Sequence, residues 1–239
     1  MEIRRETKKK EEKPAGASPL ILAMKGHPGA GKSTIARALA SSLRCPLLDK
    51  DDIRDSTIAI QRHPLFTSSS ASAAVAVLLN DLSYEALWRL ASTQLRLGLS
   101  IVVDSPLSRP AHLDRLRHIA AAEGARLLVI ECRPKDEEEW RRRIERRGAA
   151  DDASWHKPCS WKDLQRLLEG YGGCTEYDVG DVPKLVLDTT ATAEVGEIAS
   201  SVLEFVETHR DRTALKLRRR RRLQTQRLKF LGTEIQGFN

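Results

Sequence analysis

A short glycine-rich stretch has the residue types and spacing needed to bind a polyphosphate. The pattern G-x-x-x-x-G-K-[ST] is complete at Gly26, Gly31, Lys32 and Ser33. Glycines let the backbone approach an anion closely, the lysine can reach the β- and γ-phosphates, and the serine hydroxyl can hold Mg²⁺. We therefore expect a site for a nucleoside triphosphate and Mg²⁺, with Ser33 as the metal ligand. The predicted phosphate-binding residues are Gly26, His27, Pro28, Gly29, Ala30, Gly31, Lys32, Ser33 and Thr34.

The residues on either side of this loop predict the structure that it needs. An apolar run over 20–24 precedes the loop and has the length of a buried parallel strand. Residues 33–43 follow it with apolar side chains at helical spacing. A strand, a glycine-rich loop and a helix in this order place the loop amides at a helix N-terminus, where the helix dipole favours an anion. An ordinary glycine loop is the weaker interpretation.

Acidic residues follow two further predicted strands. Four acids occur within 49–55, after the short apolar run 46–48, and Asp104 ends the apolar run 100–104. In open α/β sheets, ligands bind outside the C-terminal ends of the strands. A carboxylate in that position could hold the hydroxyl of a phosphoryl acceptor or help to position Mg²⁺. A solvated loop is the alternative interpretation of residues 49–55.

Predicted strands alternate with predicted helices over residues 18–209. The strands are expected at 20–24, 46–48, 100–104, 126–132 and 184–188. This alternation predicts an α/β protein with a five-stranded parallel sheet, helices on both faces and right-handed crossovers, in the three-layer P-loop NTPase fold. One face of the helix expected over 73–97 carries Tyr84, Leu87, Trp88 and Ala91, which we assign to the core. Residues 61–72 are expected to form a loop.

Composition indicates a single globular domain. The chain has 239 residues, of which 41% are hydrophobic, which suffices for one α/β domain with a substantial core. No apolar run approaches the roughly 20 residues that a membrane span needs. The charged first residues lack the apolar segment of a secretory signal, and the four cysteines show no C-x-x-C spacing. These features favour reduced thiols and a cytoplasmic location.

The net charge of +7 belongs to the ends of the chain. Residues 1–17 are expected to form a disordered charged arm. Residues 210–239 carry ten Lys and Arg against two acids and include five consecutive arginines, whereas residues 14–209 are slightly acidic. This basic tail could serve as a nuclear address or contact RNA or an anionic surface, and a solvated tail without a specific role is the alternative. Since residues 14–209 are slightly acidic, this part of the chain is not expected to bind along a long nucleic acid.

These motifs together resemble the small P-loop kinases of the polynucleotide kinase and zeta-toxin-like group, over about residues 20–190. The loop 26–34 is similar to that family's phosphate loop. Residues 50–54, with the sequence K-D-D-I-R, are similar to its R-D-D-x-R stretch. The resemblance implies ATP as the phosphoryl donor, Asp51 as the general base, and Arg54 as a clamp on the substrate.

The same resemblance extends to a small lid, expected at about residues 141–160. Residues 142–148, R-R-I-E-R-R-G, look like the segment whose arginines touch the ATP phosphates, and Arg143 and Arg147 match best. Their i, i+4 spacing puts both on one helix face. A solvated basic face paired with neighbouring glutamates is the alternative. The resemblance also suggests Asp104 for positioning substrate or Mg²⁺, and Arg109 either as a substrate anchor or in a structural role.

The leading hypothesis is an ATP- and Mg²⁺-dependent kinase that transfers the γ-phosphoryl group to a hydroxyl. The resemblance leaves the acceptor open among nucleic-acid 5′ ends, nucleotide sugars and small molecules. Two alternatives stay open: a P-loop ATPase in which water is the acceptor, and a nucleotide-binding scaffold whose basic tail binds RNA or a partner. Residues 154–161 and 174–183 match nothing in the family, and we expect them to shape the acceptor pocket or fix the lid.

Overall fold

The computed structural model describes residues 18–66, 69–149, 157–191 and 194–210. The arm expected over 1–17, and the tail expected over 210–239 apart from its first residue, lie outside the described residues. Among the described helices, none combines the length and the apolar character that crossing a membrane requires.

One parallel sheet of five strands forms the centre of the structure, as the alternation of strands and helices predicts. Its strand order is β2-β3-β1-β4-β5, so the strand that leads into the glycine-rich loop lies in the middle. All four strand pairs are parallel. The strands are β1 (Leu20–Lys25), β2 (Leu47–Asp49), β3 (Ile101–Asp104), β4 (Arg126–Arg133) and β5 (Lys184–Asp188). This arrangement confirms the expected fold class.

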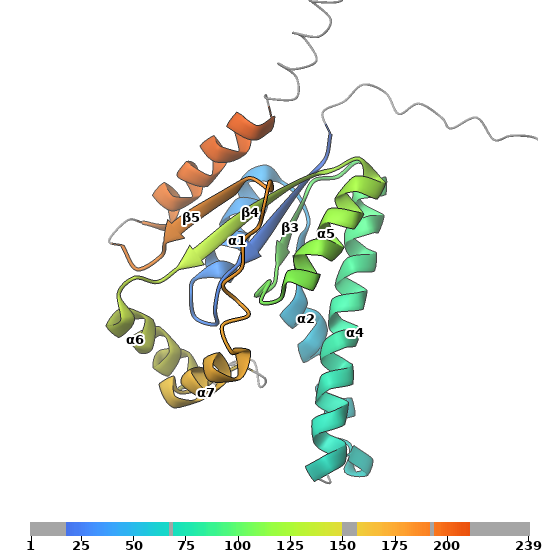
Figure 1. Ribbon diagram of the computed structural model, residues 1–239, viewed down its shortest axis with the longest axis vertical. Helices are drawn as coiled ribbons and strands as arrows, with labels where there is room; N and C mark the ends of the chain where they lie inside the picture. Colours follow the sequence, from blue (N-terminus) through green and yellow to red (C-terminus); the bar gives the residue numbers. More distant parts are fainter. Residues whose placement is uncertain (1–17, 67–68, 150–156, 192–193, 211–239) are drawn as a thin grey trace, which may run out of the picture.

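Helices cover both faces of this sheet and its C-terminal edge (Figure 1). The helices are α1 (Lys32–Leu43), α2 (Lys50–Asp55), α3 (Ile58–Gln61), the 3₁₀ helix η1 (Pro64–Phe66), α4 (Ser69–Arg96), α5 (Pro110–Glu123), α6 (Glu137–Gly148), α7 (Trp161–Tyr171) and a last helix over 195–210. Helices α1 and 195–210 pack on one face, and α4 and α5 pack on the other. Helices α6 and α7 lie beyond the strand ends, beside the loop that follows β1.

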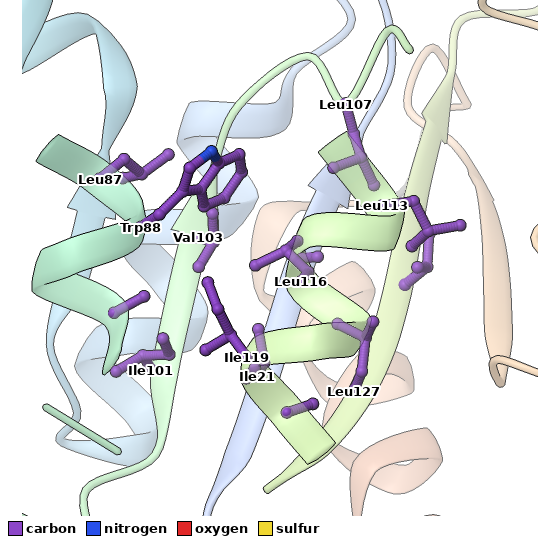
Figure 2. Close-up of a cluster of buried hydrophobic side chains, with 14 of the residues drawn as sticks. Ile21, Leu87, Trp88, Ile101, Val103, Leu107, Leu113, Leu116, Ile119 and Leu127 are labelled. Carbon is purple, nitrogen blue, oxygen red and sulfur yellow. The ribbon is translucent and has the colours of Figure 1, made fainter. Parts of the chain in front are cut away.

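Successive side chains of each strand lie on opposite faces of the sheet, and this divides the core into two halves. In β1, Ile21 and Ala23 face α4 and α5, whereas Leu20, Leu22 and Met24 face α1 and the last helix. Successive side chains of a strand point to opposite faces, so a strand covered on both sides must be apolar throughout. Figure 2 shows the half of the core on the side of α4 and α5, where side chains of these helices pack against those of the central strands.

The long helix α4 supports the predicted core stripe. Tyr84, Leu87, Trp88 and Ala91 are all buried, which confirms their assignment to the core. The helix begins at Ser69, so the loop expected over 61–72 is shorter than predicted. The prediction relied on the polarity of the serines in this stretch, but serine and alanine are compatible with a helix when the following turns are anchored by packing.

A buried ion pair marks the end of β1. Lys25 Nζ lies 2.8 Å from Glu131 Oε1, and both side chains are almost fully buried. The two residues are also register partners in the β1–β4 pair. Arg133 and Lys184 contact the same carboxylate at 2.8 and 3.2 Å. Buried charges persist only when they are paired, so this cluster holds a charged residue directly before the glycine-rich loop.

We predict that Glu131→Gln lowers the free energy of unfolding by about 3–5 kcal/mol at pH 7, because it leaves Lys25 buried without its counter-ion. Burial alone would raise the pKa of Glu131, but hydrogen bonds from Lys25, Arg133 and Lys184 outweigh it and hold the pKa at about 2. Since this pKa is below its ordinary value of 4.5, the stabilisation is fully present above pH 4.5 and is lost as the pH falls toward 2.

Urea unfolding of the wild type and the variant between pH 7 and pH 2.5 measures both effects. The difference between the two proteins should shrink over the acidic part of this range. The matched control is Glu176→Gln, which removes an exposed partner of Arg133 and should cost less than about 1 kcal/mol. Equal losses in both variants would contradict the role given to the buried pair.

Candidate active site

The glycine-rich loop joins β1 to α1 in a conformation that needs its glycines. Gly26, Gly29 and Gly31 have φ angles of 142°, 75° and 81°, a region that L side chains rarely adopt. A Cβ atom on Gly26 would lie 2.4 Å from the carbonyl oxygen of Cys132 in β4. The central strand pair therefore approaches the loop too closely for any other residue at that position.

The loop ends at the N-terminus of α1. The first helical hydrogen bond runs from the Ile35 amide to the Gly31 carbonyl, so the amides of residues 32–34 precede the hydrogen-bonded turns. Lys32 Nζ donates to the His27 carbonyl oxygen at 2.8 Å, across the mouth of the loop. Burial lowers the pKa of Lys32 from its ordinary value, and the charge of Asp104 opposes this shift. A cation and free helix amides together are suited to a phosphate group.

A cavity of about 640 Å³ opens beside the loop, which is the size of a small-molecule site. Its walls come from the loop and α1, the start of α2, α4, the end of β3, helices α6 and α7, the segment after β5 and the start of the last helix. Predicted site residues in its lining are Pro28, Gly29, Gly31, Lys32, Ser33, Thr34, Asp51, Asp104, Arg143 and Arg147. The structure thus brings the loop, both carboxylates and both lid arginines to one cavity.

Asp51 reaches this cavity through a helix where a solvated loop was the alternative. Helix α2 begins directly after β2, and the Asp49 carboxylate caps it by accepting a hydrogen bond from the Asp51 amide at 2.8 Å. The Asp51 carboxylate contacts two lysines: Oδ1 lies 3.1 Å from Lys50 Nζ, and Oδ2 lies 2.8 Å from Lys157 Nζ. The four acids of 49–55 are therefore not equivalent, since one caps a helix and one faces the cavity.

Asp104 is the second carboxylate of the cavity, and its surroundings fit a cation. It ends β3 next to Asp49 of β2, with which it pairs in register. Its Oδ2 atom is buried and has no hydrogen-bond partner among the described residues. Burial, together with the charge of Asp104, raises the pKa of Asp49 to about 6. Mg²⁺ prefers oxygen ligands, so Ser33 and Asp104 are the residues of this cavity suited to hold it.

Helix α6 carries the two predicted lid arginines. Arg143 Nε donates to Glu139 at 2.9 Å, and its Nη1 lies 3.8 Å from the position of a Cβ on Gly31. Arg147 Nη2 donates to the carbonyl oxygen of Pro158 at 2.6 Å. Burial lowers the pKa of Arg147 from its ordinary value. Both side chains face the cavity from one side of the helix, as their spacing predicts.

Aromatic contacts hold α6 against the loop. The Trp140 ring stacks on His27, with centroids 5.9 Å apart, and its Nε1 donates to the Pro28 carbonyl at 2.9 Å. Trp161 at the start of α7 meets the same indole edge-on at 5.3 Å. These contacts connect the lid to the phosphate-binding loop, and no pattern in the sequence pointed to them because the partners are far apart along the chain.

Five predicted residues lie outside the lining of this cavity. Ala30 is fully buried and belongs to the core cluster beneath α1. Arg54 is buried and donates to Thr57 Oγ1 at 2.7 Å and to Gln61 Oε1, outside the cavity lining. Arg109 is exposed at the N-cap of α5 and also lies outside the lining. Gly26 and His27 line a neighbouring hollow of about 210 Å³ behind the loop.

The cavity also contains residues that sequence reasoning did not select. Four polar ones among them are Lys50 of α2, Asn80 of α4, Lys157 of the segment before α7 and Tyr171 of α7. The sequence held a signal for Lys50, because this lysine is the first residue of the K-D-D-I-R stretch. Lys157 falls in a segment without a counterpart in the family, so only the fold reveals its position beside Asp51.

Comparison with known proteins gives a family and a fold. The family model AAA_33, described as an AAA domain, matches residues 21–170. No protein of curated function matches the chain in sequence.

Three solved structures share the fold. A provisionally assigned kinase from Chloroflexus aurantiacus has a TM-score of 0.58 and 20% identity, with 80% of this chain and 98% of that chain covered. A gluconokinase from Sinorhizobium meliloti 1021 has a TM-score of 0.53 and 17% identity, with 84% and 99% covered. The APS kinase CysC of Mycobacterium tuberculosis, in complex with AMPPNP and APS, has a TM-score of 0.50 and 17% identity, with 80% and 99% covered.

These structural similarities support the fold of small P-loop kinases, while the narrower resemblance to polynucleotide kinases and zeta-toxin-like proteins stays a prediction. The family model covers well over half of the chain and includes the glycine-rich loop, both carboxylates and both lid arginines. The chain therefore belongs to the AAA_33 family of AAA domains.

Proposed function

We propose that this chain is an ATP- and Mg²⁺-dependent phosphotransferase that moves a γ-phosphoryl group onto a hydroxyl. The observation that carries the proposal is the presence of the Asp51 carboxylate in the same cavity as Lys32 and Ser33. Phosphoryl transfer needs neutralised phosphates, aligned reactants and a group that accepts the hydroxyl proton. The residues around the cavity can supply each of these.

The loop and the lid would bind the donor. The amides at the start of α1 and the Lys32 ammonium would take the β- and γ-phosphates, replacing the contact that Lys32 makes with the His27 carbonyl. When bound, Mg²⁺ would neutralise the phosphate oxygens, with Ser33 and Asp104 as the residues suited to hold it. Arg143 and Arg147 would cover the transferring group and stabilise its charge.

Asp51 would act as the general base for the acceptor hydroxyl. The hydroxyl oxygen attacks the γ-phosphorus, its proton passes to the Asp51 carboxylate, and the bond to the leaving ADP breaks. A plain ATPase would need a residue that orients water in place of an acceptor. The cavity of about 640 Å³, with Asn80 and Tyr171 in its polar lining, instead favours an acceptor larger than water. The family resemblance leaves nucleic-acid 5′ ends, nucleotide sugars and small alcohols as acceptor classes.

We predict that Asp51→Asn lowers the turnover number by about 10²–10⁴, because the variant cannot accept the proton. Binding of ATP, measured by calorimetry with AMPPNP and Mg²⁺, should stay near the wild-type value, because the donor contacts other residues. Turnover is measured as labelled γ-phosphate transferred to 5′-hydroxyl oligonucleotides, nucleosides, nucleotide sugars and polyols. Asp52→Asn is the matched control, since Asp52 is exposed beside the cavity residue. An unchanged rate of phosphoryl transfer in Asp51→Asn would rule out Asp51 as the general base.

We also predict that Arg147→Gln slows phosphoryl transfer by about 10³, because an arginine placed on the transferring group stabilises charge that develops in the transition state. The adjacent Arg146 is exposed, so Arg146→Gln should leave the rate within about twofold. The pair Arg143→Gln and Arg142→Gln repeats the comparison one turn earlier, where Arg142 is the exposed member. Equal effects within each pair would show that the arginines act only as a solvated basic face.

A further inference from the structure

Two lysines converge on the carboxylate at the acceptor end of the cavity. Lys50 Nζ and Lys157 Nζ contact different oxygens of Asp51, at 3.1 and 2.8 Å. The side chain of Lys50 is 7% exposed and that of Lys157 is 25% exposed. Burying an ammonium group is costly unless it is paired, and here a buried and a partly exposed ammonium share the single carboxylate of Asp51, so a further negative charge at this place would stabilise both.

The charge of the whole cavity points the same way. Its described lining carries six Lys and Arg side chains but only the two carboxylates Asp51 and Asp104. The donor phosphates and their metal account for the cations of the loop and of α6. Arg37 of α1 is exposed. Lys50 and Lys157 remain beside Asp51, which is where the acceptor must lie if its hydroxyl is to reach this carboxylate. A neutral acceptor would leave this excess positive charge without a partner.

Both lysines are held in position by the fold. Lys50 is the first residue of α2, directly after β2, and its ammonium lies 5.7 Å from the centre of the Tyr84 ring, over its face. Lys157 precedes Pro158, whose carbonyl accepts the hydrogen bond of Arg147. A Cβ on Gly148 would lie 1.9 Å from the Cys159 carbonyl oxygen, so the end of α6 packs directly on the segment that carries Lys157.

The residue expected to clamp the substrate cannot provide this charge without moving. The guanidinium of Arg54 is engaged with Thr57 and Gln61, away from the cavity. The lysines are better placed, because both ammonium groups lie beside Asp51 and line the cavity. An ammonium also forms short, strong hydrogen bonds with the oxygens of an anion. Asn80 and Tyr171 add neutral polar groups to the lining of the same cavity. Burial raises the pKa of Tyr171, which keeps its hydroxyl protonated as a donor.

We propose that Lys50 and Lys157 form an anion subsite, and that the phosphoryl acceptor is an alcohol carrying a phosphate, sulfate or carboxylate group. This inference rests on the proposed function of the cavity. The anionic group of the acceptor takes the hydrogen bonds of both ammonium groups, which frees an Asp51 oxygen for the acceptor hydroxyl. The hydroxyl proton then passes to Asp51, the oxygen bonds to the γ-phosphorus, and ADP leaves.

Direct anion binding tests the subsite without any turnover. The full chain is first saturated with AMPPNP and Mg²⁺, which fills the glycine-rich loop, and inorganic sulfate is then titrated by calorimetry at constant ionic strength. We expect Lys157→Met to weaken sulfate binding by about tenfold or more and Lys157→Arg to retain it, because one charge-assisted hydrogen bond is lost only in the first. Lys162→Met, on the exposed surface of α7, is the matched control and should bind sulfate as the wild type does.

Transfer assays then distinguish the sources of the anion. Each acceptor is compared with a neutral counterpart: glycerol with glycerate and with glycerol 3-phosphate, and adenosine with adenosine 3′-phosphate. We expect a higher kcat/KM for an anionic member, and Lys157→Met should remove that preference while leaving AMPPNP affinity unchanged. The preferred member of each set identifies a carboxylate or a phosphate.

The inference is overturned if sulfate binds the wild type and Lys157→Met equally, or if neutral and anionic acceptors react equally. Either result, obtained with normal AMPPNP binding, leaves the proposed phosphotransferase in place. Failure of the wild type to bind AMPPNP with Mg²⁺ would instead overturn the proposed function and this subsite together.

Discussion

Parallel pairing of β1 with β3 on one side and β4 on the other is the constraint on which the site depends. In a parallel sheet every strand ends at the same edge, so the loops that follow the strands must meet there. The register places Asp49 beside Asp104 and Lys25 beside Glu131 at this edge. The glycine-rich loop leaves from the middle strand, where β4 approaches it closely. The cavity is thus a consequence of how the core strands pair.

A different physical interaction fixes the position of α6, the helix that carries the predicted lid arginines. Trp140 of α6 buries its ring against His27 and donates to the Pro28 carbonyl, so the helix is seated on the loop itself. Aromatic side chains bring large contact area and a defined geometry, which is enough to orient a short helix. Once Trp140 is seated, the residues one and two turns later face the cavity. The aromatic contact therefore orients Arg143 and Arg147 toward the cavity.

The charges at the C-terminal ends of the strands and in the cavity beside them do not balance. Asp49 and Asp104 lie side by side, and the pKa of Asp49 rises to about 6 through burial and the charge of its neighbour. In the described lining of the cavity, six Lys and Arg side chains outnumber two carboxylates. A cavity with a buried carboxylate at Asp104 and an excess of cations in its lining is suited to anionic ligands, because an anion offsets the cost of burying these cations.

Much of the fold could be predicted from local sequence patterns. Each strand reads as an apolar run, α4 shows its core stripe in Tyr84, Leu87, Trp88 and Ala91, and the loop after β1 has a complete phosphate-binding pattern. These signals are local because they reflect the backbone period and the identity of neighbouring residues. The boundaries were less certain, as shown by α2, which a helix cap creates inside a stretch that could have been a loop.

The amino-acid sequence by itself determined the individual strands and helices, the glycine-rich loop and the candidate carboxylates, since each depends on residues close together in the chain. Only the tertiary structure decided which charges face one another. Asp51 and Lys157 are more than a hundred residues apart, and Arg54, only three residues from Asp51, turns to different partners. Such pairings depend on how distant elements pack, and no periodicity or spacing in the chain records them.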